Sequence, residues 1–229
     1  ERHPVAVAPS AGIAARLAQD HRVDAALTAF GNPRITDEYD LPGAEAEVSQ
    51  LAQLFPQHTV YTGAQATKTN FRDAAAAAPL LHVAAHAQVD EVDPLYSRIL
   101  LANEDGHNNF LEAHEVMDMR LPNTALVTLS ACESGLGKIA SGDEVMGFSR
   151  AFLSAGSGAL IASLWPVSDD ATEVLMGTLY AALAQGQDVQ RAMQAGQLAV
   201  LHRPDMAHPF FWAPFNLIGN WRLTLGGGA

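Results

Sequence analysis

Short apolar runs alternate with helical patterns along most of this sequence, and this alternation constrains the fold more than any other feature. Three of the runs, at 80–85, 125–129 and 159–164, contain almost no polar residues. A strand that is buried on both faces carries such a run, because neither face meets water. Strands that alternate with helices form a parallel sheet covered by helices. The sequence therefore predicts an α/β fold with a mostly parallel central sheet that carries helices on both faces.

The remaining predicted elements continue the same alternation. Further strands are predicted at 25–30, 58–61 and 215–218, and helices at 44–55, 67–78, 144–155, 169–185 and 189–201. Gly31-Asn32-Pro33 predicts a turn after the first strand, and Gly156 predicts a helix end. Asp169 or Asp170 is the predicted N-cap of the helix that follows them. Polar residues interrupt the rhythm from 88 to 119, which we interpret as a surface excursion that contains a hairpin.

Length, charge and cysteine content exclude several functional classes. The chain has 229 residues, of which 48% are hydrophobic, so we expect a single domain over residues 1–229. The formal charge is 13 − 25 = −12, which argues against a nucleic-acid partner. No apolar run approaches the roughly 20 residues that span a bilayer, so no membrane partner is expected. One cysteine allows no internal disulfide, which fits a cytoplasmic protein.

Two reactive residues directly follow predicted strands. His86 follows the run at 80–85, and Cys132 follows the run at 125–129. Ligands bind beyond the carboxyl ends of parallel strands, so the two residues meet at one sheet edge if their strands are neighbours. A neighbouring base converts a thiol into a nucleophilic thiolate. Two alternatives remain: Cys132 is a buried inert thiol, or His82, on the same strand face as His86, is the base.

Metal and cofactor motifs are incomplete in this sequence. His114-Glu115 begins like a zinc-peptidase motif, but Asp118 stands where the second histidine belongs. No phosphate-binding loop is complete either. We therefore expect no metal and no cofactor.

Eight segments match the motifs of a known family in their order and spacing. They are GNP at 31–33, LPGAEAEV at 41–48, LHVAAHA at 81–87, DPLYSRILLA at 93–102, LVTLSACESGLG at 126–137, GDEVMGFSRAFLSAG at 142–156, ASLWPVSDDAT at 162–172 and HPFFWAPFNLIGNW at 208–221. On these residues nearly the whole chain resembles the CHAT domains, bacterial relatives of caspases and separase that often follow tetratricopeptide repeats.

The resemblance implies a fold, an activity and a set of site residues. The implied fold is a caspase-like three-layer sandwich, and the implied activity is that of a cysteine endopeptidase that cleaves polypeptides. His86 takes the position of the catalytic histidine and Cys132 that of the nucleophile. The backbone N–H groups of Ala87 and Cys132 are the expected oxyanion hole. The resemblance also implies a longer chain, with an N-terminal tetratricopeptide-type regulatory region or a partner protein.

One position departs from the family pattern. The family usually has glycine directly after the catalytic histidine, and this chain has Ala87. Glycine adopts a positive φ without strain and alanine does not, so a turn that needs this conformation would be distorted. The alternative to a peptidase is therefore a catalytically silent interaction module with a caspase-like fold.

The candidates for the substrate pocket are Ser130, Trp165, Asp93 and Asp169. Ser130 stands two residues before Cys132, where metacaspases carry an aspartate that binds a basic side chain. A serine provides no such charge. Trp165 follows a predicted strand and lies either in the cleft wall or in the core. Asp93 and Asp169 stand in a loop and at a helix start that could approach the site, and helix capping is the alternative role for Asp169.

Overall fold

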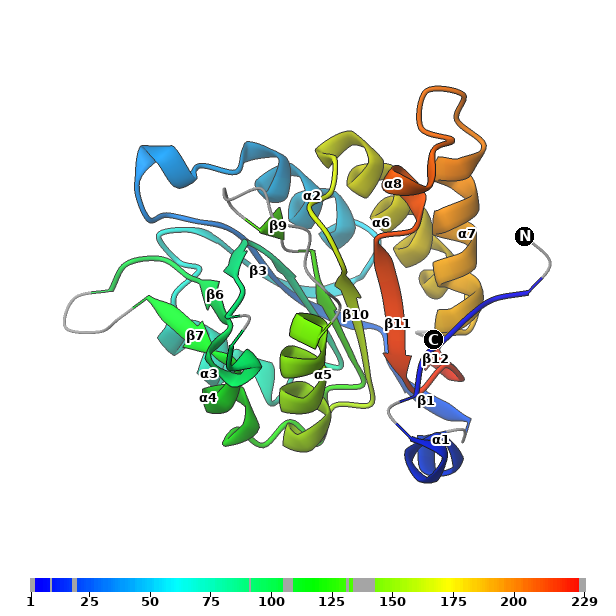
Figure 1. Ribbon diagram of the computed structural model, residues 1–229, viewed down its shortest axis with the longest axis horizontal. Helices are drawn as coiled ribbons and strands as arrows, with labels where there is room; N and C mark the ends of the chain where they lie inside the picture. Colours follow the sequence, from blue (N-terminus) through cyan, green and yellow to red (C-terminus); the bar gives the residue numbers. More distant parts are fainter. Residues whose placement is uncertain are drawn as a thin grey trace.

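A computed structural model describes residues 3–8, 10–17, 20–90, 92–104, 109–130, 132–133 and 143–226. Its centre is a six-stranded sheet with the strand order β11-β10-β8-β4-β2-β3 (Figure 1). The strands are β2 (Ala26–Pro33), β3 (Gln57–Gly63), β4 (Leu80–Ala84), β8 (Leu126–Leu129), β10 (Ala159–Ser163) and β11 (Phe215–Gly219). All neighbouring pairs are parallel except β10 and β11. The predicted, mostly parallel sheet is confirmed.

Helices cover both faces of this sheet. One face carries α2 (Pro42–Ala52), α6 (Asp169–Ala184) and α7 (Val189–Leu201), and the other carries α3 (Lys68–Ala75), α4 (Ala113–Met117) and α5 (Asp143–Ala155) (Figure 1). Successive side chains of a strand point to opposite faces. In β4, Leu80 and Ala84 accordingly belong to one buried cluster, while Leu81 and Val83 belong to the other. The three-layer sandwich is therefore confirmed.

A second, smaller sheet extends the central one. Its strand order is β7-β6-β5-β9, with β5 (His86–Gln88), β6 (Arg98–Leu100), β7 (Phe110–Glu112) and β9 (Cys132–Glu133). β6 and β7 pair antiparallel, which confirms the hairpin predicted within 88–119. A 3₁₀ turn, η2 (Pro94–Tyr96), separates β5 from β6. β5 and β9 are parallel and continue the directions of β4 and β8.

Several short elements were not predicted from the sequence. They are α1 (Ala11–Leu17), β1 (His21–Asp24), η1 (Asp37–Tyr39), α8 (Pro209–Trp212) and β12 (Leu223–Gly226). β1 and β12 form a parallel pair between the two ends of the chain, a pairing that no local pattern indicates. Within the described part of the chain, no helix is long and apolar enough to cross a membrane.

Two predicted boundaries are wrong, and one is confirmed. Gly31-Asn32-Pro33 belongs to β2 instead of a turn, because β2 continues along β3 with a register shift between Gly31 and Pro33. The N-cap of α6 is Ser168, and Asp169 and Asp170 lie in the first turn. Carboxylates are favourable there because they face the positive end of the helix dipole. Gly156 ends α5 with φ +113°, as predicted.

Helix α2 lies directly on the backbone of β2 at Gly31. A Cβ atom at this position would lie 2.9 Å from the carbonyl oxygen of Ala44 and within 3.0 Å of the methyl groups of Val48. Both neighbours belong to α2. Only a glycine lets the helix approach β2 this closely, and this approach places the residues before α2 beside the sheet edge.

We expect Gly31→Ala to lower the free energy of unfolding by about 1–3 kcal/mol, because the added methyl group overpacks the contact with α2. The matched control is Gly177→Ala in α6, where a Cβ atom meets nothing within 4 Å. This control should raise the free energy of unfolding by up to about 1 kcal/mol, since alanine is the better helix former. Urea unfolding of both variants measures the difference. Equal stabilities would contradict the close packing of α2 on β2.

Candidate active site

The two candidate catalytic residues lie opposite each other on neighbouring strands. β4 and β8 pair Leu80 with Leu126, a separation of 126 − 80 = 46 residues. β5 and β9 pair His86 with Cys132, again 132 − 86 = 46 residues. The register therefore continues unchanged from the central sheet into the small sheet. Because paired strands lie about 4.8 Å apart, the backbones of His86 and Cys132 are direct neighbours, as the sequence predicted.

This edge of the sheet is also where the strand order reverses. β2 lies between β3 and β4, so the chain leaves β2 toward one side of the sheet and later returns on the other. Loops that diverge at such a point leave a crevice beyond the carboxyl ends of the strands. The connection from β2 to α2 reaches this edge, where the Tyr39 carbonyl oxygen meets His86 just after β4.

The side chain of His86 is oriented by a backbone carbonyl. Its Nε2 lies 3.2 Å from the carbonyl oxygen of Tyr39, at the end of η1. The Tyr39 ring meets the imidazole edge-on, with 5.4 Å between centroids. A carbonyl oxygen only accepts hydrogen bonds, so Nε2 carries the proton. Nδ1 is buried and has no hydrogen-bond partner among the described residues, so it is the basic nitrogen.

Burial sets the charge of this imidazole. Desolvation of the half-buried ring lowers the pKa of His86 below the usual 6.5, and the hydrogen bond to Tyr39 opposes this shift. Burial disfavours the charged form of a histidine, whereas a hydrogen bond to its N–H favours that form. The net shift is downward, so His86 is neutral at pH 7 and its Nδ1 can accept a proton.

Ala87 adopts an ordinary extended conformation. It lies in β5, between Ile99 of β6 and Glu133 of β9. Among the described residues other than glycine, only Asn32 has a positive φ. Alanine at position 87 is therefore unstrained and does not adopt the positive φ that a glycine would allow. The part of Ala87 and Cys132 in an oxyanion hole stays a prediction.

His82, the competing base, is enclosed in the core. It is 0% exposed, with Nδ1 3.0 Å from the Tyr180 hydroxyl and Nε2 2.7 Å from Glu47 Oε1. The Tyr180 hydroxyl donates to Thr128, and burial raises the pKa of Tyr180, so it stays protonated. Both ring nitrogens of His82 are thus occupied, and the ring does not reach the sheet edge. His82 stabilises the core.

The carboxylate of Glu47 connects three elements beneath the site. Glu47 lies on α2 and contacts His82 of β4. It also accepts a hydrogen bond of 3.2 Å from Ser130, at the end of β8. Ser130 is buried, and its N–H donates to the carbonyl of Val83 in β4. Glu47 therefore joins the two strands that lead to His86 and Cys132.

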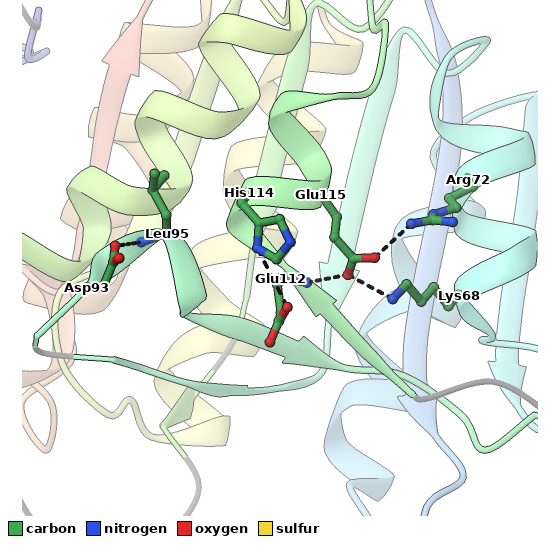
Figure 2. Close-up of polar contacts among 7 residues, drawn as sticks. All are labelled: Lys68, Arg72, Asp93, Leu95, Glu112, His114 and Glu115. Carbon is green, nitrogen blue, oxygen red and sulfur yellow. Dashed lines mark hydrogen bonds and ion pairs between the residues drawn. The ribbon is translucent and has the colours of Figure 1, made fainter.

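The other pocket candidates lie in different places. Asp93 accepts a hydrogen bond from the N–H of Leu95 and caps η2 (Figure 2). The indole N–H of Trp165, just after β10, donates to the carbonyl of Phe210, and the ring is half-buried. Asp169 is exposed at the start of α6, with its carboxylate against Gly43 of α2. A role of these residues in substrate binding stays a prediction.

Glu115, next to His114, has a structural role. It forms ion pairs with Lys68 at 2.7 Å and Arg72 at 2.8 Å, which join α4 to α3 (Figure 2). His114 points instead toward Glu112, 3.5 Å away. Across the described ranges, no group of three His, Cys, Asp or Glu side chains is arranged to hold a metal ion.

An acidic hollow of about 480 Å³ adjoins the Tyr39 segment. It lies at the carboxyl ends of β2 and β3, and Asp37, Asp40 and Glu45 line it together with Arg34. Three carboxylates and one guanidinium give the hollow a negative charge.

Part of the candidate nucleophile motif, residues 134–137, lies outside the described residues, and Cys132 is described by its backbone.

Comparison with known proteins identifies the family. The model of the CHAT domain matches residues 1–220. This chain belongs to the CHAT domain family. Its relatives include tetratricopeptide repeat protein 28 of Homo sapiens, 34% identical over 110 residues, and that of Mus musculus, 31% identical over 110 residues. Each alignment covers 48% of this chain and 4% of the relative, so this CHAT domain spans a small part of such proteins.

Solved structures show the same fold. The Arg-specific cysteine proteinase gingipain R superimposes with a TM-score of 0.62 at 12% identity, over 93% of this chain and 51% of that one. A complex of the pro- and mature domains of RgpB from Porphyromonas gingivalis gives 0.61 at 14% identity, over 92% and 52% of the two chains. The likeness establishes that the CHAT domain has the caspase-like fold of these proteases.

Three contributors to the candidate site were not found from the sequence. Tyr39 acts through its carbonyl group, which every residue has, so no sequence signal could have indicated it. Glu47 lies on a predicted helix, but its contacts with His82 and Ser130 span 35 and 83 residues. Asn32 was interpreted as part of a turn. Its positive φ of 47° is a conformation that asparagine tolerates better than most residues.

We expect the pKa of His86 to lie below 6.5 in a Cys132→Ala protein, in which no thiol titrates beside the ring. Burial disfavours the imidazolium, so lowering the pH through 6.5 should leave His86 neutral while exposed histidines gain protons. The ring resonances of ¹⁵N-labelled histidine, followed by NMR as a function of pH, measure this pKa. A value of 6.5 or higher would contradict the described burial of the ring.

Proposed function

We propose that this CHAT domain is a cysteine endopeptidase that cleaves polypeptides with a dyad of His86 and Cys132. The observation that supports this proposal is the unchanged register that sets His86 opposite Cys132 at the sheet edge. The Tyr39 carbonyl accepts the hydrogen bond from Nε2–H of His86, so Nδ1 is the basic nitrogen. The caspase-like fold is consistent with this chemistry, although a fold alone does not define an activity.

In the proposed reaction, Nδ1 of His86 takes the proton of the Cys132 thiol. The thiolate attacks the carbonyl carbon of the scissile peptide bond and forms a tetrahedral oxyanion. Backbone N–H groups of Ala87 and Cys132 stabilise this oxyanion. The imidazolium then gives its proton to the leaving amine, and a thioester with Cys132 remains. Water hydrolyses the thioester with His86 as base, which restores the thiol.

The Tyr39 carbonyl contributes in two ways. It keeps the proton on Nε2, so that Nδ1 can act as the base, and it accepts the N–H of the imidazolium that forms during the reaction. The hydrogen bond to Tyr39 favours the charged imidazole, while burial disfavours it. The balance keeps the ring neutral at rest and able to accept a proton in the transition state.

The substrate would bind across the crevice beyond the strand ends. Trp165 and Asp169 follow β10, on the Cys132 side of that edge, and are the candidates for substrate contacts. Ser130 would contribute indirectly, through its hydrogen bond to Glu47. Asp93 would contribute by shaping the loop after β5.

The proposed setting is a longer cytoplasmic protein. The relatives are named as tetratricopeptide repeat proteins, so we propose that a repeat region or a partner protein regulates this domain. The single cysteine fits a reducing compartment. The silent interaction module remains the alternative, because Ala87 is extended and lacks the positive φ that a glycine at this position would allow.

Cleavage of a diverse peptide library tests the proposal. We expect products from the native chain and none from Cys132→Ala, because the substitution removes the nucleophile. His86→Ala should lower the rate by about a hundredfold or more, since it removes the general base. Mass spectrometry of the products would also show the residue before the cleaved bond. The same products from Cys132→Ala would contradict the proposal.

A further inference from the structure

Asn32 occupies an unusual position at the end of β2. Its backbone is left-handed, with φ +47°, and the residue is only 8% exposed. Apart from glycine, asparagine and aspartate are the residues that adopt this conformation most readily. A buried amide in a conformation of this kind must find hydrogen-bond partners, because an unsatisfied polar group costs free energy in the core.

The side-chain amide of Asn32 holds the start of helix α2. Its Oδ1 accepts the N–H of Leu41 at 2.7 Å. Its Nδ2 donates to Asp40 at 2.9 Å and to Glu45 at 3.3 Å. The partners fix the orientation of the amide, since a flipped group would set oxygen against two carboxylates. Leu41 is the N-cap residue of α2, and Asn32 accepts its backbone N–H, so the amide ties the start of the helix to the end of β2.

The segment that Asn32 holds carries the Tyr39 carbonyl. Tyr39 directly precedes Asp40 and Leu41, and η1 closes through the bond from Tyr39 N–H to Thr36 at 3.0 Å. Gly31, the residue before Asn32, lets α2 lie on β2 at close range. The Tyr39 carbonyl is thus fixed from both sides, and it lies 3.2 Å from Nε2 of His86.

We propose that Asn32 is a positioning residue that fixes the protonated nitrogen of His86 by holding the Tyr39 carbonyl. Asn32 does not contact His86; it acts through Leu41, Asp40 and the backbone between them. The catalytic consequence rests on the proposed peptidase function. The geometric claim does not, because the hydrogen bond between His86 and Tyr39 can be measured without any substrate.

Solvent exchange of the His86 Nε2 proton tests this inference. In a Cys132→Ala protein with ¹⁵N-labelled histidine, we expect NMR to show a protected Nε2–H signal for His86. Asn32→Gly keeps the left-handed backbone and removes only the amide, so it should speed this exchange by about tenfold or more. The matched control is Asn103→Ala, which removes an amide that holds the Ile35 carbonyl of the same connection. The control should leave the exchange rate unchanged.

Each outcome decides the claim. Three results would overturn it. They are native-like exchange of the His86 proton in Asn32→Gly, equally faster exchange in Asn103→Ala, and no protected His86 Nε2–H signal in the protein that keeps Asn32. If Asn32→Gly does not fold, Asn32→Asp replaces it, because aspartate tolerates the same backbone and loses the donor to Asp40 and Glu45. Faster exchange in that variant supports the claim, and native-like exchange overturns it. A positive exchange result together with the same peptide products from the native chain and Cys132→Ala would refute the peptidase proposal alone.

Discussion

The pairing of β4 with β8 is the constraint on which the candidate site depends. These two strands lie side by side in the centre of the sheet, and their register continues into β5 and β9. A slip of one residue would move every side chain of a strand to the opposite face, so the two buried clusters hold the register in place. The apolar core thereby sets His86 opposite Cys132, although neither residue belongs to the six-stranded sheet.

Helix α2 connects the core to the site at three points. Its close approach at Gly31 fixes it on β2, and its start is held by Asn32. Glu47, further along the same helix, contacts His82 and Ser130. The buried carboxylate has partners on both strands, which offsets the cost of its desolvation. The helix thus orients His86 through the Tyr39 carbonyl and supports the strand that leads to Cys132.

The sequence predicted those parts of the molecule that local patterns determine. The apolar runs located β4, β8 and β10, and position at a strand end singled out His86 and Cys132 as the candidate dyad. The segment around Asn32 could not be predicted, because asparagine before proline is typical of turns and only the pairing with β3 makes it a strand end. Tyr39 acts through its backbone, and Glu47 acts across distant parts of the chain. Contacts of these two kinds leave no pattern in a single sequence.

The central claim is that His86 activates Cys132, and the rate of covalent labelling of the thiol tests it most directly. Cys132 is the single cysteine of the chain, so a thiol-directed probe reports on it alone. We predict that the native protein reacts rapidly near pH 7 and that His86→Ala reacts about tenfold or more slowly, because the thiolate loses its base. Tyr96→Phe, an exposed aromatic change, should leave the rate unaltered. Equal labelling rates in the native protein and His86→Ala would contradict the dyad.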